Sequence, residues 1–209
     1  MNPIFITGIG TGIGKTIVAA IITEALKADY WKPIQAGFDG GSDLDRISDL
    51  VSNKTTKLHP ETYLLRMPAS PHIAARNEHK EIDLQEILAQ YERIKREDTR
   101  LVIEGAGGLL VPLNQKEFVI DLIKKLQAEV ILVSRNYLGS INHSLLTATV
   151  SRANDLNVSG WVFNDQYLNY EDEIVEWSGY KKLGSVPKVP EVNRSFIQQQ
   201  AELLKQTLI

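Results

Sequence analysis

The chain has 209 residues, a length that fits one domain over residues 1–209 and permits burial of about 70% of the unfolded surface. Its composition, 43% hydrophobic and 23% charged, is that of an ordinary globular protein, and a net charge of -3 at pH 7 gives no basic patch for nucleic acid. The chain has no Cys, which excludes disulfides and thiolate metal sites and fits a reducing compartment.

The N-terminal residues and the apolar runs indicate a protein without a targeting or membrane segment. An apolar run begins after one polar residue, with no basic region ahead of it. The longest apolar runs, such as VAAII, are far shorter than the roughly 20 residues that span a bilayer. We therefore expect a cytoplasmic protein with no membrane partner.

Short apolar runs recur along the chain and predict the strands of a sheet. They do not alternate with polar residues, and segments of helical period separate them. This pattern indicates a mostly parallel sheet with helices on both faces, and hence a single α/β domain. The predicted strands are residues 4–7, 30–33, 101–104, 130–134, 159–163 and 182–186.

The segments between these runs have the apolar spacing of amphipathic helices. In DLQEILAQYERI, residues 83–94, apolar side chains recur at spacings of 3, 4 and 7. Residues 53–80 contain three prolines and no clear period, so we expect an irregular excursion there. Further helices are predicted from about Gly14, over 118–127, over 143–156, and along the C-terminal stripe of Ile197, Ala201, Leu204 and Leu208.

Residues 8–16, GIGTGIGKT, lie between the first predicted strand and the first predicted helix. The usual phosphate-binding loop, G-x-x-x-x-G-K-[ST], would need Gly at the position of Ile9. Glycines still allow the backbone N–H groups to face an anion, and the helix N-terminus adds partial positive charge. Lys15 would supply a full charge for the phosphates, and Thr16 a hydroxyl for Mg²⁺.

Two other interpretations of this loop are a simple turn and a dinucleotide-binding loop. A tight turn with an exposed lysine is the more common meaning of an isolated GKT, but the strand–turn–helix context favours a phosphate site. The dinucleotide pattern G-x-G-x-x-G is not met, since Ile13 or Lys15 stands where its third Gly would fall. Lys32 and Pro33 also stand where that fold needs an acidic residue, so a dehydrogenase is disfavoured.

Two acidic segments are candidates for binding a metal ion. Glu104 ends an apolar strand and precedes GAGG, so its carboxylate is expected in the crevice at the carboxyl edge of the sheet. A helix cap or a solvated strand end is the alternative. In GSDLDRI, Ser42 predicts a helix start, and first-turn charge alone would explain Asp43. From the residues alone, Asp45 and Asp49 are equally good candidates.

Lys32, His72 and the segment LGSINH carry weaker signals. Lys32 lies between Trp31 and Pro33 at the end of a strand, where it would face the phosphates and stabilise charge during transfer. A lone histidine such as His72 is more often structural, and we assign it no catalytic role. LGSINH, residues 138–143, looks like a helix start that Ser140 or Asn142 caps, with N–H groups that would also bind a carboxylate.

Eight segments in order along most of the chain resemble the dethiobiotin synthetase family of ATP-dependent carboxylases, which have the P-loop NTPase fold. The family's phosphate loop is a longer form, and Gly8 and Gly14 have its spacing. The resemblance implies a homodimer with its active sites at the interface. The segments are ITGIGTGIGKT, KPIQAG, GSDLDRI, SPHIAA, VIEGAGGLLVPL, VILVSRNYLGSINH, GWVFND and LGSVP.

The same resemblance implies roles for individual residues. The catalytic residues would be Lys15, Lys32 and Thr11, and the Mg²⁺ ligands would be Thr16, Asp43 and Glu104. ATP would be bound by Gly8, Gly12, Ile13, Gly14, Lys15, Thr16, Glu104 and Gly107, with Asn164 and Pro187 at the adenine. The diamine substrate would be held by Thr11, Lys32, Ala36, Gly108, Leu109, Leu110, Val111, Leu138, Gly139, Ser140 and Asn142.

The implied reaction joins 7,8-diaminononanoate and CO₂ into dethiobiotin at the expense of ATP. Three positions depart from the family pattern: Gly12 replaces an acidic or polar residue, Ala36 replaces Ser or Thr, and Tyr137 stands where Lys can occur. A hydroxyl missing at Ala36 removes one hydrogen bond, worth about 1 kcal/mol. These departures bear on substrate binding and leave the nucleotide site intact.

Other P-loop ATPases are the alternative classes. A cobyric-acid-type amidoligase would normally need a glutaminase cysteine in the same chain or in a partner, and this chain has none. A partitioning-type switch ATPase would turn over ATP in response to a macromolecule. A non-catalytic nucleotide-binding module is the third class.

Overall fold

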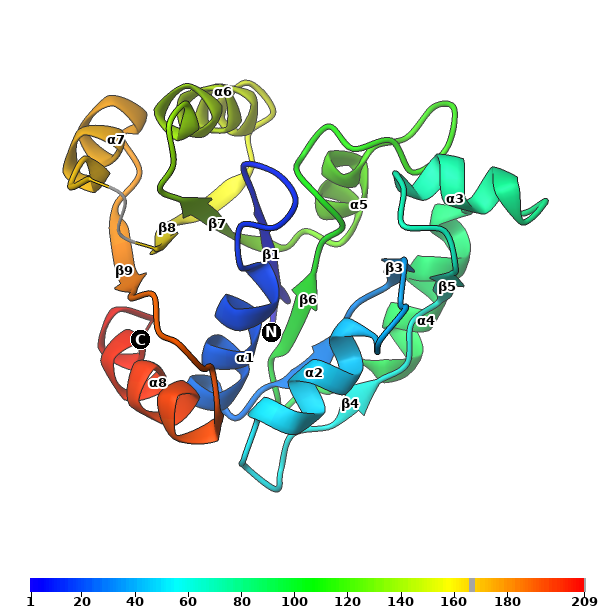
Figure 1. Ribbon diagram of the computed structural model, residues 1–209. Helices are drawn as coiled ribbons and strands as arrows, with labels where there is room; N and C mark the ends of the chain where they lie inside the picture. The colour runs from blue at the N-terminus through cyan, green and yellow to red at the C-terminus, as the bar shows by residue number, and fades with distance from the viewer. Residues whose placement is uncertain (166–167, 209) are drawn as a thin grey trace.

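A seven-stranded sheet forms the centre of the computed structural model, which describes residues 1–165 and 168–208 (Figure 1). All its neighbouring strands pair in parallel, as predicted. The N-terminal strand lies in the middle, with a strand from the second half of the chain beside it. The order is β4 (Leu58–His59), β2 (Asp29–Trp31), β6 (Leu101–Glu104), β1 (Ile4–Gly8), β7 (Glu129–Arg135), β8 (Asn157–Asn164) and β9 (Lys182–Val186).

Helices cover both faces of this sheet. One layer holds α1 (Lys15–Leu26), α2 (Asp43–Leu50) and α8 (Arg194–Leu208). The other holds α3 (Pro71–Asn77), α4 (Leu84–Ile94), α5 (Val119–Lys125), α6 (Ser140–Ala153) and α7 (Glu171–Ser178). In Figure 1 α8 lies directly beside α1, and so the last helix packs against the first.

Each face of the sheet has its own hydrophobic core, because successive strand residues point to opposite sides. Phe5 of β1 packs with the α3–α7 layer, while its neighbours Ile4 and Ile6 pack with the α1, α2 and α8 layer. All three side chains are fully or almost fully buried. The non-alternating apolar runs in the sequence therefore correctly indicated a sheet that is covered on both sides.

The segment 53–80 is more regular than its sequence suggested. It contains β4, β5 (Tyr63–Leu65) and α3, and β5 pairs in parallel with β3 (Ile34–Ala36) in a separate two-stranded sheet. The prediction of an irregular excursion was wrong for these parts. Strands of two or three residues are too short to show a period, and the helix α3 begins at one of the prolines, Pro71.

Two predictions about element ends need correction, and one is confirmed. Ser42 does cap α2, in a capping box with Asp45. By contrast, the N-cap of α6 is Gly139, at φ 102°, and neither Ser140 nor Asn142 caps the helix. The predicted strand 30–33 ends at Trp31, where the pairing of β2 with β6 stops. Helix α7 was not predicted.

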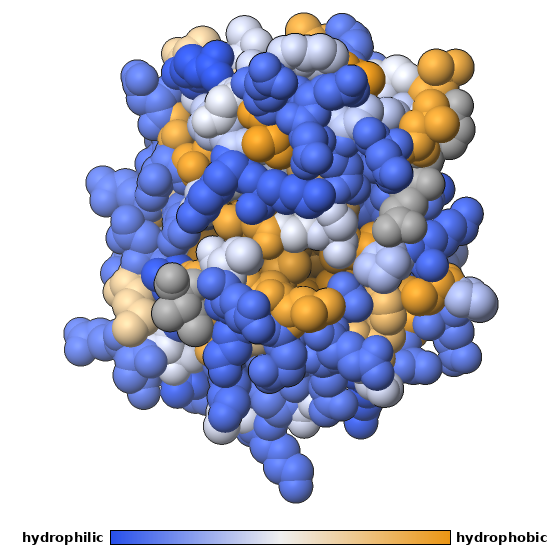
Figure 2. All heavy atoms as spheres, turned by 90° about the vertical axis from the view of Figure 1, so that its left-hand side faces the viewer, coloured by the Kyte–Doolittle hydropathy of each residue, from blue (hydrophilic) through white to orange (hydrophobic). Residues whose placement is uncertain are grey.

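The face of the molecule that includes the edge strand β9 is largely hydrophilic. In Figure 2 polar side chains cover most of this face, and hydrophobic atoms reach the surface near its centre, between the helices above and below. None of the helices in the described part of the chain is long and apolar enough to cross a bilayer.

Candidate active site

The glycine-rich segment between β1 and α1 forms a loop at the carboxyl edge of the sheet. Helix α1 begins at Lys15, and Gly14 is its N-cap with φ 91°, a left-handed conformation that suits glycine. A Cβ atom at Gly14 would lie only 1.6 Å from Asn164 Nδ2. That amide donates a hydrogen bond of 2.9 Å to the carbonyl of Ile13, so Asn164 packs directly against the loop.

The residues after Glu104 also approach the loop closely. A Cβ atom at Gly108 would lie 2.9 Å from the carbonyl oxygen of Gly8, which explains the need for glycine there. Gly105 N donates to the carbonyl of Ile6, so the strand β6 leads straight into this contact. The glycines of EGAGG therefore let two backbone segments meet at the site.

Lys15 is buried within the loop. Its Nζ donates a hydrogen bond of 2.6 Å to the carbonyl of Gly10. Burial lowers the pKa of Lys15 to about 8, although the nearby Glu104 carboxylate acts in the opposite direction. The ammonium of Lys15 therefore lies inside the loop, at the mouth of which anions would be attracted to it.

Three oxygen-bearing side chains converge beside the loop, from three different elements. The hydroxyl of Thr16 on α1 donates to Asp43 Oδ1 at 3.0 Å and lies 2.9 Å from Glu104 Oε1. Lys32 Nζ lies 2.5 Å from Asp43 Oδ2 and 2.9 Å from Glu104 Oε1. Two carboxylates and a hydroxyl form a hard-oxygen donor set of the kind that Mg²⁺ prefers.

The charges in this cluster stabilise one another. Burial acts to lower the pKa of Lys32, but Glu104 and Asp43 outweigh it and the pKa is raised. Burial acts to raise the pKa of Asp43, and Lys32 outweighs it so that this pKa is lowered. The ammonium and the Asp43 carboxylate therefore keep their charges in spite of burial.

The structure separates Asp43 from the two other candidates on α2. Asp45 accepts hydrogen bonds from Ser42 N and Oγ, and so it serves as a helix cap. Asp49 is exposed, while its backbone carbonyl accepts from Arg194. Only Asp43 reaches Thr16 and Lys32 among these three, as the resemblance implied.

A cavity of about 870 Å³ opens over the loop and this cluster. Thirteen of the site residues that the resemblance implies line this cavity, and they include residues assigned to ATP and residues assigned to the diamine. They are Thr11, Gly12, Gly14, Lys15, Thr16, Lys32, Ala36, Asp43, Glu104, Gly107, Val111, Asn164 and Pro187.

The remaining predicted residues lie outside the cavity lining. Gly8 and Ile13 are buried beneath the loop, and Leu109 is buried in the core. Ser140 is fully buried, and its Oγ hydrogen-bonds the hydroxyl of Tyr170 at 2.8 Å. The others are exposed or half-buried at the surface: Gly108, Leu110, Leu138, Gly139 and Asn142.

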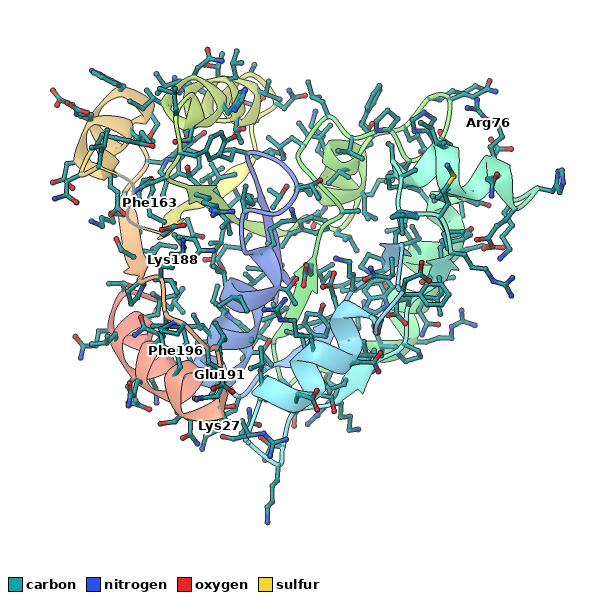
Figure 3. The ribbon with its side chains drawn as sticks, in the orientation of Figure 1. Lys27, Arg76, Phe163, Lys188, Glu191 and Phe196 are labelled. Carbon is teal, nitrogen blue, oxygen red and sulfur yellow. The ribbon has the colours of Figure 1, made fainter. Side chains whose placement is uncertain are left out.

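The cavity also has lining residues that the sequence analysis missed. Lys188 and Phe196, labelled in Figure 3, come from the C-terminal part of the chain and flank the cavity on the side of α8. Arg135 is the last residue of β7, contacts the Gly12 carbonyl at 3.4 Å and pairs with Asp165 at 3.2 Å. The sequence offered a signal for Arg135, since it directly follows the predicted strand 130–134, but none for Phe196.

The sequence analysis also missed Tyr30, which contacts the cluster of Thr16, Asp43 and Glu104. It is fully buried, and its hydroxyl donates a hydrogen bond of 2.8 Å to Glu104 Oε2. Burial and the Glu104 carboxylate raise the pKa of Tyr30 well above its usual value, so the phenol keeps its proton. His72, to which we assigned no catalysis, contacts Ser70 Oγ through Nδ1 at 3.1 Å.

Comparison with known proteins identifies the family. A family model described as an AAA domain matches residues 2–195. A curated ATP-dependent dethiobiotin synthetase of Christiangramia forsetii is 46% identical over 207 residues, covering 98% of this chain and 96% of that one. The chain belongs to the dethiobiotin synthetase family. The Cytophaga hutchinsonii synthetase is also 46% identical and covers 94% of each chain, and the Agrobacterium fabrum synthetase is 40% identical and covers 93% and 90%.

Solved structures share the fold of this synthetase family member at much lower identity. The MinD protein in the MinC:MinD complex of Aquifex aeolicus superposes with a TM-score of 0.60 at 18% identity, covering 99% of this chain and 94% of that one. MinD of Pyrococcus furiosus gives 0.58 at 12% identity, covering 100% and 98%. These similarities confirm the predicted P-loop NTPase fold and bear on the fold alone.

Proposed function

We propose that the protein is a dethiobiotin synthetase, which uses ATP to convert 7,8-diaminononanoate and CO₂ into dethiobiotin, ADP and phosphate in biotin biosynthesis. The observation that carries the proposal is the cavity in which Lys32 meets the Thr16–Asp43–Glu104 oxygen cluster beside the phosphate loop. Full-length similarity to synthetases at 46% identity supports the same substrates.

The proposed metal site consists of Thr16, Asp43 and Glu104, whose oxygens fit Mg²⁺ in number and hardness. When bound, Mg²⁺ would neutralise charge on the phosphate oxygens of ATP. Lys32 occupies the space between the two carboxylates, so that it would share their charge with the metal and with the substrate.

The proposed reaction starts when one amine of the diamine takes up CO₂ as a carbamate. A carbamate oxygen attacks the γ-phosphorus of ATP, ADP leaves with the electron pair of the broken P–O bond, and a carbamic–phosphoric anhydride forms. The second amine then attacks the anhydride carbonyl and expels phosphate, which closes the ring. Each step needs positioning and charge neutralisation more than a nucleophilic side chain.

The residues of the chain supply that positioning. The N–H groups of the loop and Lys15 would hold the β- and γ-phosphates, and Asn164 with Pro187 would bound the adenine. Lys32 would stabilise negative charge on the carbamate and on the phosphoryl group in transfer. Thr11, exposed on the loop at the cavity, would contact both phosphate and substrate.

The rest of the substrate site would come from a second copy of the chain. Leu110 and Leu138 are 57% and 87% exposed, so both side chains are accessible to a second copy of the chain. Both belong to the segments that, by the family resemblance, hold the diamine and its carboxylate across a homodimer. We therefore include the homodimer in the proposal.

An assay of the purified protein tests this function directly. With the diamine, bicarbonate and Mg·ATP it should release ADP and dethiobiotin in equal amounts. ADP release that does not depend on the diamine would contradict the proposal and favour another P-loop ATPase. A switch ATPase would instead respond to a macromolecule, and an amidoligase to an amino donor.

Lys32→Ala separates an enzyme from a module that only binds nucleotide. We expect turnover to fall by about 10²–10³-fold, because the charge that stabilises phosphoryl transfer is lost, while the affinity for ATP changes far less. Steady-state rates and equilibrium titration with ATP measure the two effects. Unaltered turnover in this variant would count against the role of Lys32.

A further inference from the structure

The Tyr30 hydroxyl is a buried group for which the proposed reaction gives no role. Tyr30 pairs with Val102 in the register between β2 and β6, so its side chain lies on the same sheet face as Glu104, two residues further along. That face is covered by α1, which carries Thr16. Tyr30 therefore reaches Glu104 from behind, within the sheet and away from the cavity, whose lining does not include it.

The two oxygens of the Glu104 carboxylate have different partners. Oε1 lies 2.9 Å from both the Thr16 hydroxyl and Lys32 Nζ, on the side of the cavity. Oε2 accepts the Tyr30 hydroxyl at 2.8 Å, in a fully buried contact. The hydrogen bond fixes the rotation of the carboxylate about its last bond, and so it decides which oxygen faces the metal site.

We propose that Tyr30 is a positioning residue that restricts Glu104 to a single metal-binding oxygen and thereby sets the preference of this site for Mg²⁺ over Ca²⁺. The inference rests on the proposed function, because it requires the metal site of Thr16, Asp43 and Glu104. It concerns how the site chooses its ion, which the family assignment leaves open.

The chemistry of the two ions explains the preference. Mg²⁺ is small and takes six ligands in a regular octahedron, which suits a carboxylate that offers one oxygen. Ca²⁺ takes six to eight oxygens and readily binds both oxygens of one carboxylate. Because Tyr30 holds Oε2, Glu104 can bind a metal ion through Oε1 alone, as Mg²⁺ requires, but not through both oxygens, as Ca²⁺ prefers.

Tyr30→Phe is the test variant, because it removes only the hydroxyl. Tyr63→Phe is its matched control, since Tyr63 is also buried and its hydroxyl also donates to a carboxylate, that of Glu86 at 2.5 Å. Tyr63 and Glu86 lie outside the lining of the cavity. Both variants lose a hydrogen bond to a carboxylate, and only the first loses one to the proposed metal ligand.

The measurement is calorimetric titration with ADP in saturating Mg²⁺ and in saturating Ca²⁺. We expect Tyr30→Phe to bind Mg·ADP about tenfold more weakly and to bind Ca·ADP as well as or better than the unaltered protein, in line with the effect of groups that orient metal ligands. The ratio of the two dissociation constants should be unchanged in Tyr63→Phe. An unchanged ratio in Tyr30→Phe would overturn the inference.

The unaltered protein provides a second test that does not depend on the folding of a variant. In its crystal structure with Mg·ADP, Glu104 should bind the metal through Oε1 alone and keep the contact of Oε2 with Tyr30. A carboxylate that binds Mg²⁺ through both oxygens would refute the inference. Binding of ADP that is independent of Mg²⁺ would refute the proposed metal site itself, and the inference with it.

Discussion

Gly14 is a position in the glycine-rich loop that does not tolerate a side chain. Its φ of 91° is unfavourable for any residue with a side chain, and Asn164 occupies the place of a Cβ atom. The same glycine thus starts helix α1 and admits the side chain assigned to the adenine pocket. Gly10, only four residues earlier, would accept a Cβ atom without any contact within 4 Å.

Gly14→Ala should therefore weaken ATP binding by at least about tenfold, because a strained backbone conformation alone costs about 1–3 kcal/mol. Gly10→Ala is the control, and its affinity should stay within about twofold of the original. Equilibrium titration with ATP compares the two variants. Equal affinities in both would show that the loop adapts to a side chain at Gly14.

Individual residues differed in how far the sequence could predict them. Lys32 and Glu104 lie at the ends of predicted strands, so their place at the carboxyl edge followed from the parallel pattern, and that of Lys15 followed from the glycine-rich loop between a strand and a helix. The role of Tyr30 depends on a partner 74 residues away, which local spacing cannot indicate. Asp43 could be separated from its neighbours only by the family resemblance, and the structure then supplied the physical reason.

The C-terminal end of helix α1 is anchored by the carboxylate of Glu24, which lies outside the candidate active site. Glu24 accepts hydrogen bonds from Ser52 N at 2.8 Å and Ser52 Oγ at 2.7 Å, and weaker ones from Asn53. Burial acts to raise the pKa of Glu24, but these hydrogen bonds outweigh it and lower the pKa. The contact joins α1 to the chain that leaves α2.

Glu24→Gln should lower the free energy of unfolding at pH 7 by about 1 kcal/mol. Because the pKa is lower in the folded state, the ionised carboxylate stabilises the fold above about pH 4.5, and this stabilisation is lost as the pH falls further. The difference between the variant and the original should shrink below that pH. Urea unfolding at several pH values measures it, with the exposed Glu202→Gln as the control; a difference that is independent of pH would contradict the assignment.

Elements with a long apolar run were the predictable ones. The strands β1, β6, β7, β8 and β9 all lie within about two residues of their predicted ranges. The strands β3, β4 and β5 have two or three residues each, and pairing with neighbours defines them more than their own sequence does. Helix α7 has acidic residues throughout its first turn and few apolar ones, and so it gave only a weak signal.

At the scale of the whole molecule, the proposed homodimer concerns two exposed leucines, Leu138 and Leu110. Leu138 precedes α6 and is 87% exposed, and Leu110 follows the glycines that come after β6. Neither lines the cavity, although the resemblance assigns both to the substrate. The proposed homodimer would bring both side chains to the cavity of the partner chain.

Leu138→Asp should therefore convert the protein from dimer to monomer and reduce synthetase activity at least about tenfold. Folding should be unaffected, because the side chain has no place in the core. Sedimentation velocity measures the oligomeric state, and the unfolding temperature measures the stability. Leu203→Asp is the control, because Leu203 is also exposed and lies on the outer face of α8. A monomeric original protein with full activity would contradict the interface.

The central position of β1 has a consequence for synthesis on the ribosome. Ile4 pairs with Val102 on one side and with Glu129 on the other, so the first strand to emerge stays unpaired until about half of the chain has been made. Asn164 and Pro187 complete the cavity later still. At about 5–20 residues per second, several seconds pass between synthesis of the glycine-rich loop and synthesis of the residues that pack around it. Nascent chains that end before β7 should thus have no ATP affinity, and the nucleotide becomes a ligand only near the end of translation.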